Sequence, residues 1–188
     1  MVKVNGNDII QSADLSSLRI TFYPDARLKQ DCAEVPDPAD PAVGALAERM
    51  FELMFAGRGV GLAGPQVGVT ARLFVASPTA DTGDRRVYIN PRIISSEGSQ
   101  EDDEGCLSFP GIFCKIKRHA SVTIRAQGLD GEWFEESGSD LHARILQHES
   151  DHLDGILLVD RMGSVARLSN RKALKALQQR YAEAGQSR

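Results

Sequence analysis

The chain has 188 residues, enough for one domain with a hydrophobic core and a cleft. Its hydrophobic content of 41% is typical of globular proteins, and its net charge of -4 argues against a nucleic-acid binder with a broad basic surface. The sequence also has no bilayer-spanning apolar stretch, no signal-type N-terminus and only three cysteines, so we expect a cytoplasmic protein without membrane association, disulfide framework or direct DNA binding.

The first part of the chain predicts a short strand and one helix. Residues 19–23 alternate like a strand that ends in a turn at residues 24–25. Asp40 is a candidate N-cap, Pro41 takes the first helical position, and Gly57 is placed to end the helix. The apolar residues that recur at helical spacing predict the buried face of this helix: Val43, Leu46, Ala47, Met50 and Met54.

Residues 57–68 hold five glycines in twelve positions. A nucleotide-binding loop is disfavoured, because the stretch lacks Gly-Lys-Ser/Thr and follows a helix instead of a strand. The glycines instead allow the backbone to approach an extended ligand closely. Gln66 is the one side chain in this stretch that can both donate and accept hydrogen bonds.

The middle of the chain is rich in strand signals. A strand at residues 87–89 is expected to end at a turn formed by Asn90 and Pro91, and the acidic residues 97–104 to form a solvated segment. Asp130-Gly131 predicts a hairpin turn. The other expected strands lie at residues 73–76 and 121–127 and in a return strand from Trp133.

A helix near the three-quarter mark carries the strongest functional signal. The segment 137–140 has a capping-box pattern, Leu141, Ile145 and Leu153 predict an apolar stripe, and Gly155 is placed to end the helix. Within it, residues 148–152 read His-Glu-Ser-Asp-His. Histidines four apart share one helix face and can bind one metal ion, and the intervening glutamate can take a proton from water.

Two further segments complete the chain. Residues 156–159 predict a last short strand. Residues 168–185 predict a C-terminal helix that begins at Ser169 or Asn170. Its basic face, with Lys172 and Lys175, could contact an RNA-rich partner, although docking of the helix on the body is the simpler interpretation.

A catalytic metal site needs a third protein ligand. Leu158 stands where one class of protease has a third histidine, and the downstream acids lie in no convincing ligand setting. Cys106, next to Gly105, is therefore the best upstream candidate, although spacing alone excludes neither Cys32 nor Cys114. His142 should face away from His148, and His119 is interpreted as a turn or surface residue.

Three segments together resemble the signature motifs of peptide deformylases, in the family's order. They are Gly-Val-Gly-Leu-Ala-Gly-Pro-Gln at 59–66, Glu-Gly-Cys-Leu-Ser at 104–108 and Gln-His-Glu-Ser-Asp-His at 147–152. The likeness covers most of the chain, from residue 23 through 155. Gly64 departs from the usual alanine, which should loosen the loop slightly, and the less usual His142 is expected to alter the lining next to the pocket.

The resemblance implies an α+β fold: antiparallel strands around a central metal-binding helix, with an N-terminal helix and a C-terminal helix, in a single catalytic domain over 1–188. It implies one divalent metal ion bound by Cys106, His148 and His152, typically Fe(II) in the cell. Such a thiolate and imidazole set also suits Zn, Ni or Co. The implied reaction removes the formyl group from the N-terminal formyl-methionine of nascent peptides and releases formate.

The resemblance also implies roles for other residues. Glu149 would be the general base, and the oxyanion would be held by the metal, the Gln66 side chain and the Leu107 N–H. The remaining residues would bind the peptide or support the ligands: Val60, Gly61 and Gly105 along the peptide backbone, Ile145 in a methionine pocket, Glu104 on a ligand imidazole, and Asp151 paired with Arg118.

Two alternatives remain on the sequence alone. One is a metallopeptidase, and the other is a relative that keeps the metal only for structure or peptide binding. The intact Glu149 and Gln66 disfavour the second, since a structural site needs neither. The C-terminal helix resembles that of bacterial deformylases in which this tail can contact the ribosome.

Overall fold

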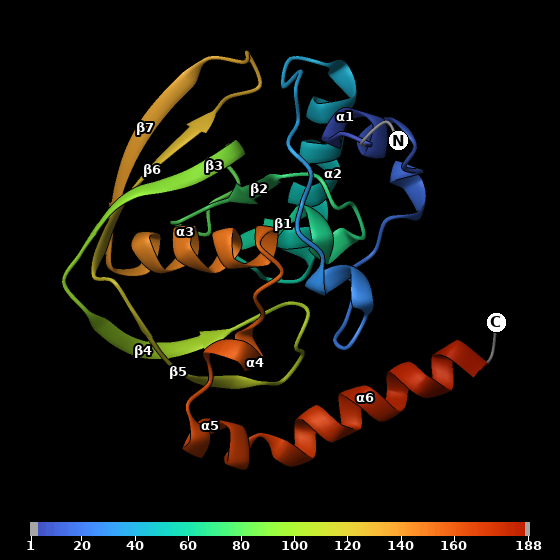
Figure 1. The fold of residues 1–188 in the computed structure, drawn as a ribbon, viewed down its shortest axis with the longest axis vertical. Coiled ribbons are helices and arrows are strands. Elements are labelled where there is room, and N and C mark those ends of the chain that lie inside the picture. Colours follow the sequence, from blue (N-terminus) through green and yellow to red (C-terminus); the bar gives the residue numbers. More distant parts are fainter. Residues whose placement is uncertain (1–3, 187–188) are drawn as a thin grey trace.

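The structure, a computed structural model, describes residues 4–186 as two antiparallel sheets with a helix between them. Figure 1 shows α3 (Asp140–Leu153) lying between the larger sheet and the smaller hairpin. The larger sheet has the order β1-β2-β3-β6-β7 and the smaller one pairs β4 with β5. Their strands are β1 (Gly61–Ala63), β2 (Leu73–Ala76), β3 (Arg86–Glu97), β4 (Gln100–Gly105), β5 (Phe113–Arg118), β6 (Ser121–Gln127) and β7 (Trp133–Ser139). The predicted α+β class is confirmed.

Helix α2 (Pro41–Ala56) begins and ends as the sequence predicts. The Asp40 side chain accepts a hydrogen bond from the Ala42 N–H, Pro41 is the first helical residue, and Gly57 is the C-cap. All five apolar residues predicted for its inner face are at most 1% exposed. They pack with β1 and β2 in the first core cluster, so this helix forms one wall of the core.

Helix α3 is buried at every residue from Ala143 through Leu153. Its polar residues are therefore held away from water, which needs either partners or a function. Its start differs from the prediction. Strand β7 continues to Ser139, whose side chain makes no capping hydrogen bond, so the capping box is wrong. Leu141 is 52% exposed and does not belong to the buried stripe.

Four other predicted segments differ from the structure. Residues 19–23 form no strand. The Thr21 N–H donates to the Gln66 carbonyl and the Tyr23 N–H donates to the Ser108 carbonyl, so the segment pairs with two separate loops and with no strand. Strand β3 passes through Asn90 in a bulge with φ 50°. Residues 97–104 include strand β4, which pairs with β5. Residues 156–159 run into the short helix α4 (Leu158–Arg161).

Residues 4–186 also contain helical segments outside the ranges predicted from the sequence. Helix α1 (Gly6–Gln11) and the 3-10 turns η1 (Leu15–Ser17), η2 (Ala26–Lys29) and η3 (Gly64–Val67) have no counterpart in the predictions. The predicted C-terminal helix is divided at Asn170 into α5 (Ser164–Ser169) and α6 (Arg171–Gln186).

Helix α6 docks through its first half and runs away from the two sheets (Figure 1). Leu174 and Leu177 are buried in the third core cluster, whereas Tyr181 is 43% exposed. In residues 4–186, no helix is both long and apolar enough to cross a membrane.

Candidate metal centre

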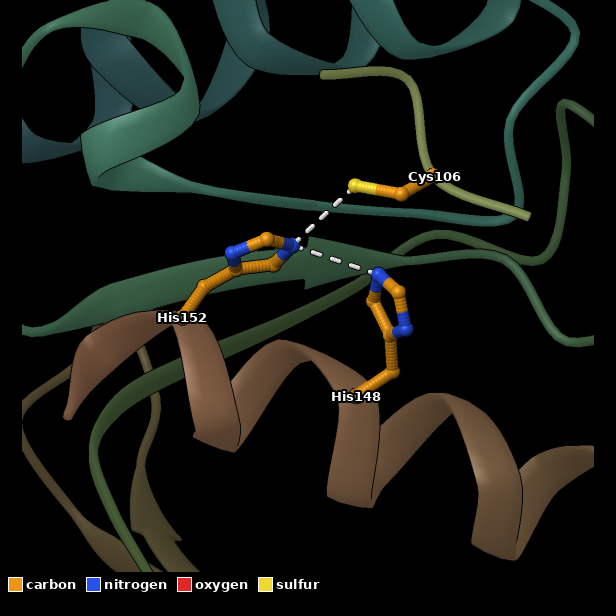
Figure 2. A group of neighbouring side chains, drawn as sticks. All are labelled: Cys106, His148 and His152. Carbon is orange, nitrogen blue, oxygen red and sulfur yellow. Dashed lines mark hydrogen bonds between the residues drawn. The ribbon is translucent and has the colours of Figure 1, made fainter. Parts of the chain in front are cut away.

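Cys106, His148 and His152 lie together although they come from two parts of the chain. Figure 2 shows both histidines projecting from α3 toward the cysteine on the loop after β4. The Cys106 Sγ is 3.3 Å from the His152 Nε2, which is 3.2 Å from the His148 Nε2. One ligand atom from each residue lies within 4.8 Å of the others. Cys32 and Cys114, the alternatives that spacing left open, are not part of this group.

These three side chains fit a divalent metal ion. Metal–nitrogen bonds of about 2.0–2.1 Å and metal–sulfur bonds of about 2.3 Å place tetrahedral ligand atoms about 3.3–3.6 Å apart. The observed separations, 3.2 Å between the two nitrogens and 3.3 Å between nitrogen and sulfur, are within about 0.3 Å of that spacing. The Nδ1 of His148 lies 2.6 Å from the Glu104 Oε1, which favours a proton on Nδ1 and leaves the Nε2 lone pair facing the site. Burial lowers the pKa of His152, whereas hydrogen bonds with Cys106 and Glu104 outweigh burial and raise the pKa of His148, so metal binding would displace a proton from the His148 ring.

Glu104 is the centre of a buried ion-pair network. Its carboxylate accepts hydrogen bonds from Arg118 at 2.7 and 3.1 Å and from Arg144 at 2.8 Å. Burial raises the pKa of Glu104, but the hydrogen bonds from His148 and Arg118 outweigh this and hold that pKa well below its usual range. Arg118 also donates to Asp151 at 2.6 Å, the pairing proposed from the family likeness.

Two arginines of this network were not predicted. Arg144 lies one helical turn before His148, and its Nη1 bonds to Glu104 and to the Ile116 carbonyl. The four-residue spacing to His148 was a usable signal for Arg144. Arg161 binds Asp151 with two nitrogens from α4, a contact that no local pattern indicates.

Glu149 lies in the wall of the same site and is 4% exposed. Its Oε2 is buried and has no hydrogen-bond partner in the described part of the chain. Burial raises the pKa of Glu149 to about 7. A Cβ on Gly61 would lie only 2.3 Å from the Glu149 Oε1, so the glycine is what lets β1 pass against this carboxylate.

Gln66 is oriented by its own loop. Its Oε1 accepts from the Ala63 N–H at 2.8 Å, which leaves the Nε2 as a donor. That Nε2 is 3.3 Å from the Cys106 Sγ and 3.2 Å from the Ser108 Oγ. Ser108 was not assigned a role from the sequence, although it ends the second motif.

The prediction that glycine in place of alanine at position 64 loosens its loop is wrong. A Cβ there would lie 2.6 Å from the Val69 carbonyl oxygen and 2.8 Å from that of Ala71. These carbonyls occupy the space that a methyl group would need. The loop is therefore packed closely around the glycine.

A pocket of about 410 Å³ opens beside Cys106 and His148. Its lining includes all of the residues expected to touch substrate: Val60, Gly61, Gln66, Gly105, Leu107, Ile145 and Glu149. Leu141 and Phe113, which were not predicted, add apolar surface at 52% and 68% exposure.

His142 and His119 lie elsewhere. His142 faces Tyr88 and Glu136 and does not line the pocket, so its expected effect on the lining is wrong, whereas its predicted direction away from His148 is right. His119 lies exposed in the turn between β5 and β6, as predicted.

Comparison with known proteins agrees with this geometry. The family model described as polypeptide deformylase matches residues 17–168. A peptide deformylase of Acidobacterium capsulatum is 45% identical over 150 residues, covering 79% of this chain and 88% of that one. Two solved structures are also similar: a plant peptide deformylase 1B (40% identity, TM-score 0.86, covering 90% of this chain and 93% of that one) and a Legionella pneumophila peptide deformylase (39%, 0.81, 88% and 98%).

Proposed function

Because the chain belongs to the polypeptide deformylase family, we propose that it holds its metal ion through Cys106, His148 and His152. Its reaction is the hydrolysis of the formyl group on the N-terminal formyl-methionine of newly made polypeptides, which releases formate. The observation that carries the ligand assignment is the position of the His152 Nε2, 3.3 Å from the Cys106 Sγ and 3.2 Å from the His148 Nε2, beside a buried glutamate oxygen that has no partner within residues 4–186. The two alternatives, a metallopeptidase and a non-catalytic relative, are not favoured.

The bound metal supplies Lewis-acid polarisation and makes a water molecule more acidic. Glu149 takes the proton from the attacking water and then delivers it to the leaving amine, since its Oε2 is buried and has no hydrogen-bond partner within the described residues. Glu104 keeps the His148 ring in the orientation and tautomer that a ligand needs. Arg118 and Arg144 compensate the buried charge of Glu104, and Asp151 holds Arg118 in place.

Gln66 and Leu107 stabilise the negative charge that develops on the formyl oxygen. The Ala63 N–H fixes the Gln66 amide with its Nε2 toward Cys106, so the donor is in place before the substrate arrives. The N–H of Leu107, next to that ligand, is the second donor of this proposal.

The peptide binds in extended form between two strand edges. Strand β1 is an edge of the larger sheet and β4 is an edge of the smaller one. Gly61 and Gly105 line the pocket from these strands, with Val60 preceding β1. Main-chain groups there can pair with a peptide as an added strand, while Ile145 lies in the apolar pocket that accepts the methionine side chain.

One assay tests this assignment. Protein purified without oxygen is analysed for metal and offered formyl-methionyl and unblocked peptides. We expect amine release from the formylated peptide alone, loss of that release in Glu149→Ala with metal retained, and loss of metal in Cys106→Ser. Glu135→Ala, an exposed glutamate on β7, is the matched control. Full turnover by Glu149→Ala, or full metal content in Cys106→Ser, would contradict the proposal.

We also propose Fe(II) as the native metal and the cytoplasm as the site of action. Soft thiolate and imidazole ligands suit Fe(II), Zn, Ni and Co alike, so the metal bound after anaerobic purification decides among them. Three free cysteines agree with a reducing compartment. Residues 1–188 are proposed to act as one catalytic domain.

The basic face of α6 is proposed to contact the ribosome. Lys172 and Lys175 are exposed, whereas Leu174 and Leu177 on the other face dock the helix. Replacing both lysines by glutamine should weaken co-sedimentation with ribosomes and leave hydrolysis of free formyl peptides unchanged. Unchanged co-sedimentation would argue against the contact.

A further inference from the structure

A second cleft, of about 600 Å³, lies on a different face of α3 from the metal pocket. It is bounded by the end of β3, the turn into β4, the end of β5, and the helices α3 and α4. Gln147 and Asp151 line it from α3, and no residue lines both cleft and metal pocket. Of the residues that line this cleft, only Arg118 and Asp151 have a part in the proposed reaction, and both act by supporting Glu104.

The cleft carries an excess of positive charge. Lys117, Arg118 and Arg161 line it together with one carboxylate, Asp151. Behind the cleft surface, three guanidinium groups (Arg118, Arg144 and Arg161) share two carboxylates (Glu104 and Asp151), so the network keeps one net positive charge (3 - 2 = +1). The carboxylates present are therefore already neutralised by their arginines.

Arg161 is the exposed member of this network. Its Nε and Nη2 bind the two oxygens of Asp151 at 2.9 and 2.5 Å, while its Nη1 makes no hydrogen bond within residues 4–186. The side chain is 43% exposed, so this donor is accessible to a ligand. Asp151 thus fixes the guanidinium plane at the cleft and leaves one edge of it free.

Other polar groups around the cleft also lack partners. Within the described residues, the Ser96 and Ser99 hydroxyls and the His119 imidazole form no hydrogen bond, and all three residues line the cleft. Ile93, which is 38% exposed, provides an apolar wall, whereas Val122 is only 2% exposed. The donors and the aliphatic wall together offer a ligand both polar and apolar contacts.

We propose that this cleft binds a phosphate group, either as the free ion or as the monoester of a small organic molecule. An oriented guanidinium with a free N–H matches the tetrahedral oxyanion, and hydroxyl donors complete its hydrogen bonds. The positive excess favours a dianion over a neutral ligand. The apolar wall and the volume leave room for an organic body attached to the phosphate.

The test is a calorimetric titration of the metal-loaded protein with inorganic phosphate and, separately, with adenosine monophosphate. We expect saturable one-to-one binding of at least one of them, at least tenfold weaker in Arg161→Gln. Arg171→Gln removes the same charge from an exposed position outside the cleft and should bind within twofold of the unmodified protein. Equal affinities for the two ligands would identify the free ion as the ligand, and tighter binding of the nucleotide would identify a monoester held by the apolar wall.

A second variant and a competition experiment complete the test. Ser99→Asp places a carboxylate on the exposed turn without touching the ion-pair network, so it should weaken binding even if Arg161→Gln is unstable. A saturating unformylated methionyl peptide should leave phosphate affinity unchanged, because the two clefts share no residue. Competition by that peptide, no saturable binding, or normal binding by Ser99→Asp would overturn the proposal.

Discussion

Gly61→Ala should lower activity about 100-fold while leaving the metal and the fold in place. The added methyl group would lie 2.3 Å from the Glu149 Oε1, 2.8 Å from its Cδ and 2.9 Å from its Cγ. Real Cβ atoms do not approach other atoms this closely. The backbone of β1 is held by its pairing with β2, so the carboxylate is the group that moves.

The size of the effect follows from the displacement. Ordinary contact begins at about 3.4 Å, so the carboxylate must shift by about 1 Å, and a misplacement of that order costs about 100-fold in rate. That corresponds to about 2.7 kcal/mol of transition-state stabilisation, within the range expected for loss of a general base. The metal ligands are untouched, so metal content should remain equimolar.

The assay is kcat/KM on a formyl-methionyl tripeptide, with metal analysis and a thermal melt on the same sample. Gly44→Ala is the matched control, because a Cβ there meets nothing within 4 Å. That control should keep full activity and gain up to about 1 kcal/mol of stability, since Gly44 lies inside α2. Activity of Gly61→Ala within threefold of the unmodified protein, with metal bound, would refute the positioning of Glu149 by this glycine.

Three other predictions concern the supporting residues. Glu104→Ala should lower metal affinity by about 10–100-fold, measured by competition with a chelator, because His148 loses the acceptor that orients it; unchanged metal content and turnover would refute this role. In a double-mutant cycle, Asp151 and Arg118 should couple by at least about 0.5 kcal/mol in urea unfolding, and additive effects would show that they act separately. Gly64→Ala should destabilise the fold by about 1–3 kcal/mol, because the Val69 carbonyl occupies the methyl position; an unchanged melt would refute that packing.

The predictions that succeeded rest on local chemistry. The Asp40 cap, Pro41 and the apolar spacing determine α2 within one stretch of chain. The alternation in residues 121–127 determines β6 in the same way. The four-residue spacing of His148 and His152 fixes their common helix face, so both could be assigned before any contact was known.

The predictions that failed depend on partners far along the chain. Asn90-Pro91 has a turn signature, but the Asn90 side chain bonds to Val35 and Gln127 and lets β3 continue through a bulge. The acidic segment from residue 97 is largely exposed, as predicted, but its pairing with β5 as strand β4 was not predicted.

The sequence by itself predicted the ligand types, the general base and the helix that carries two of the proposed ligands, because each prediction depends on residue identity and short-range spacing. The tertiary structure decided the rest. It brought Cys106, and neither of the other two cysteines, to the histidines, and it placed Gly61 against Glu149. It also surrounded Glu104 with Arg118 from β5 and with Arg144 and His148 from α3. Those contacts join residues 14 to 88 positions apart, and only the packing of β1, β4 and β5 around α3 brings them within bonding distance.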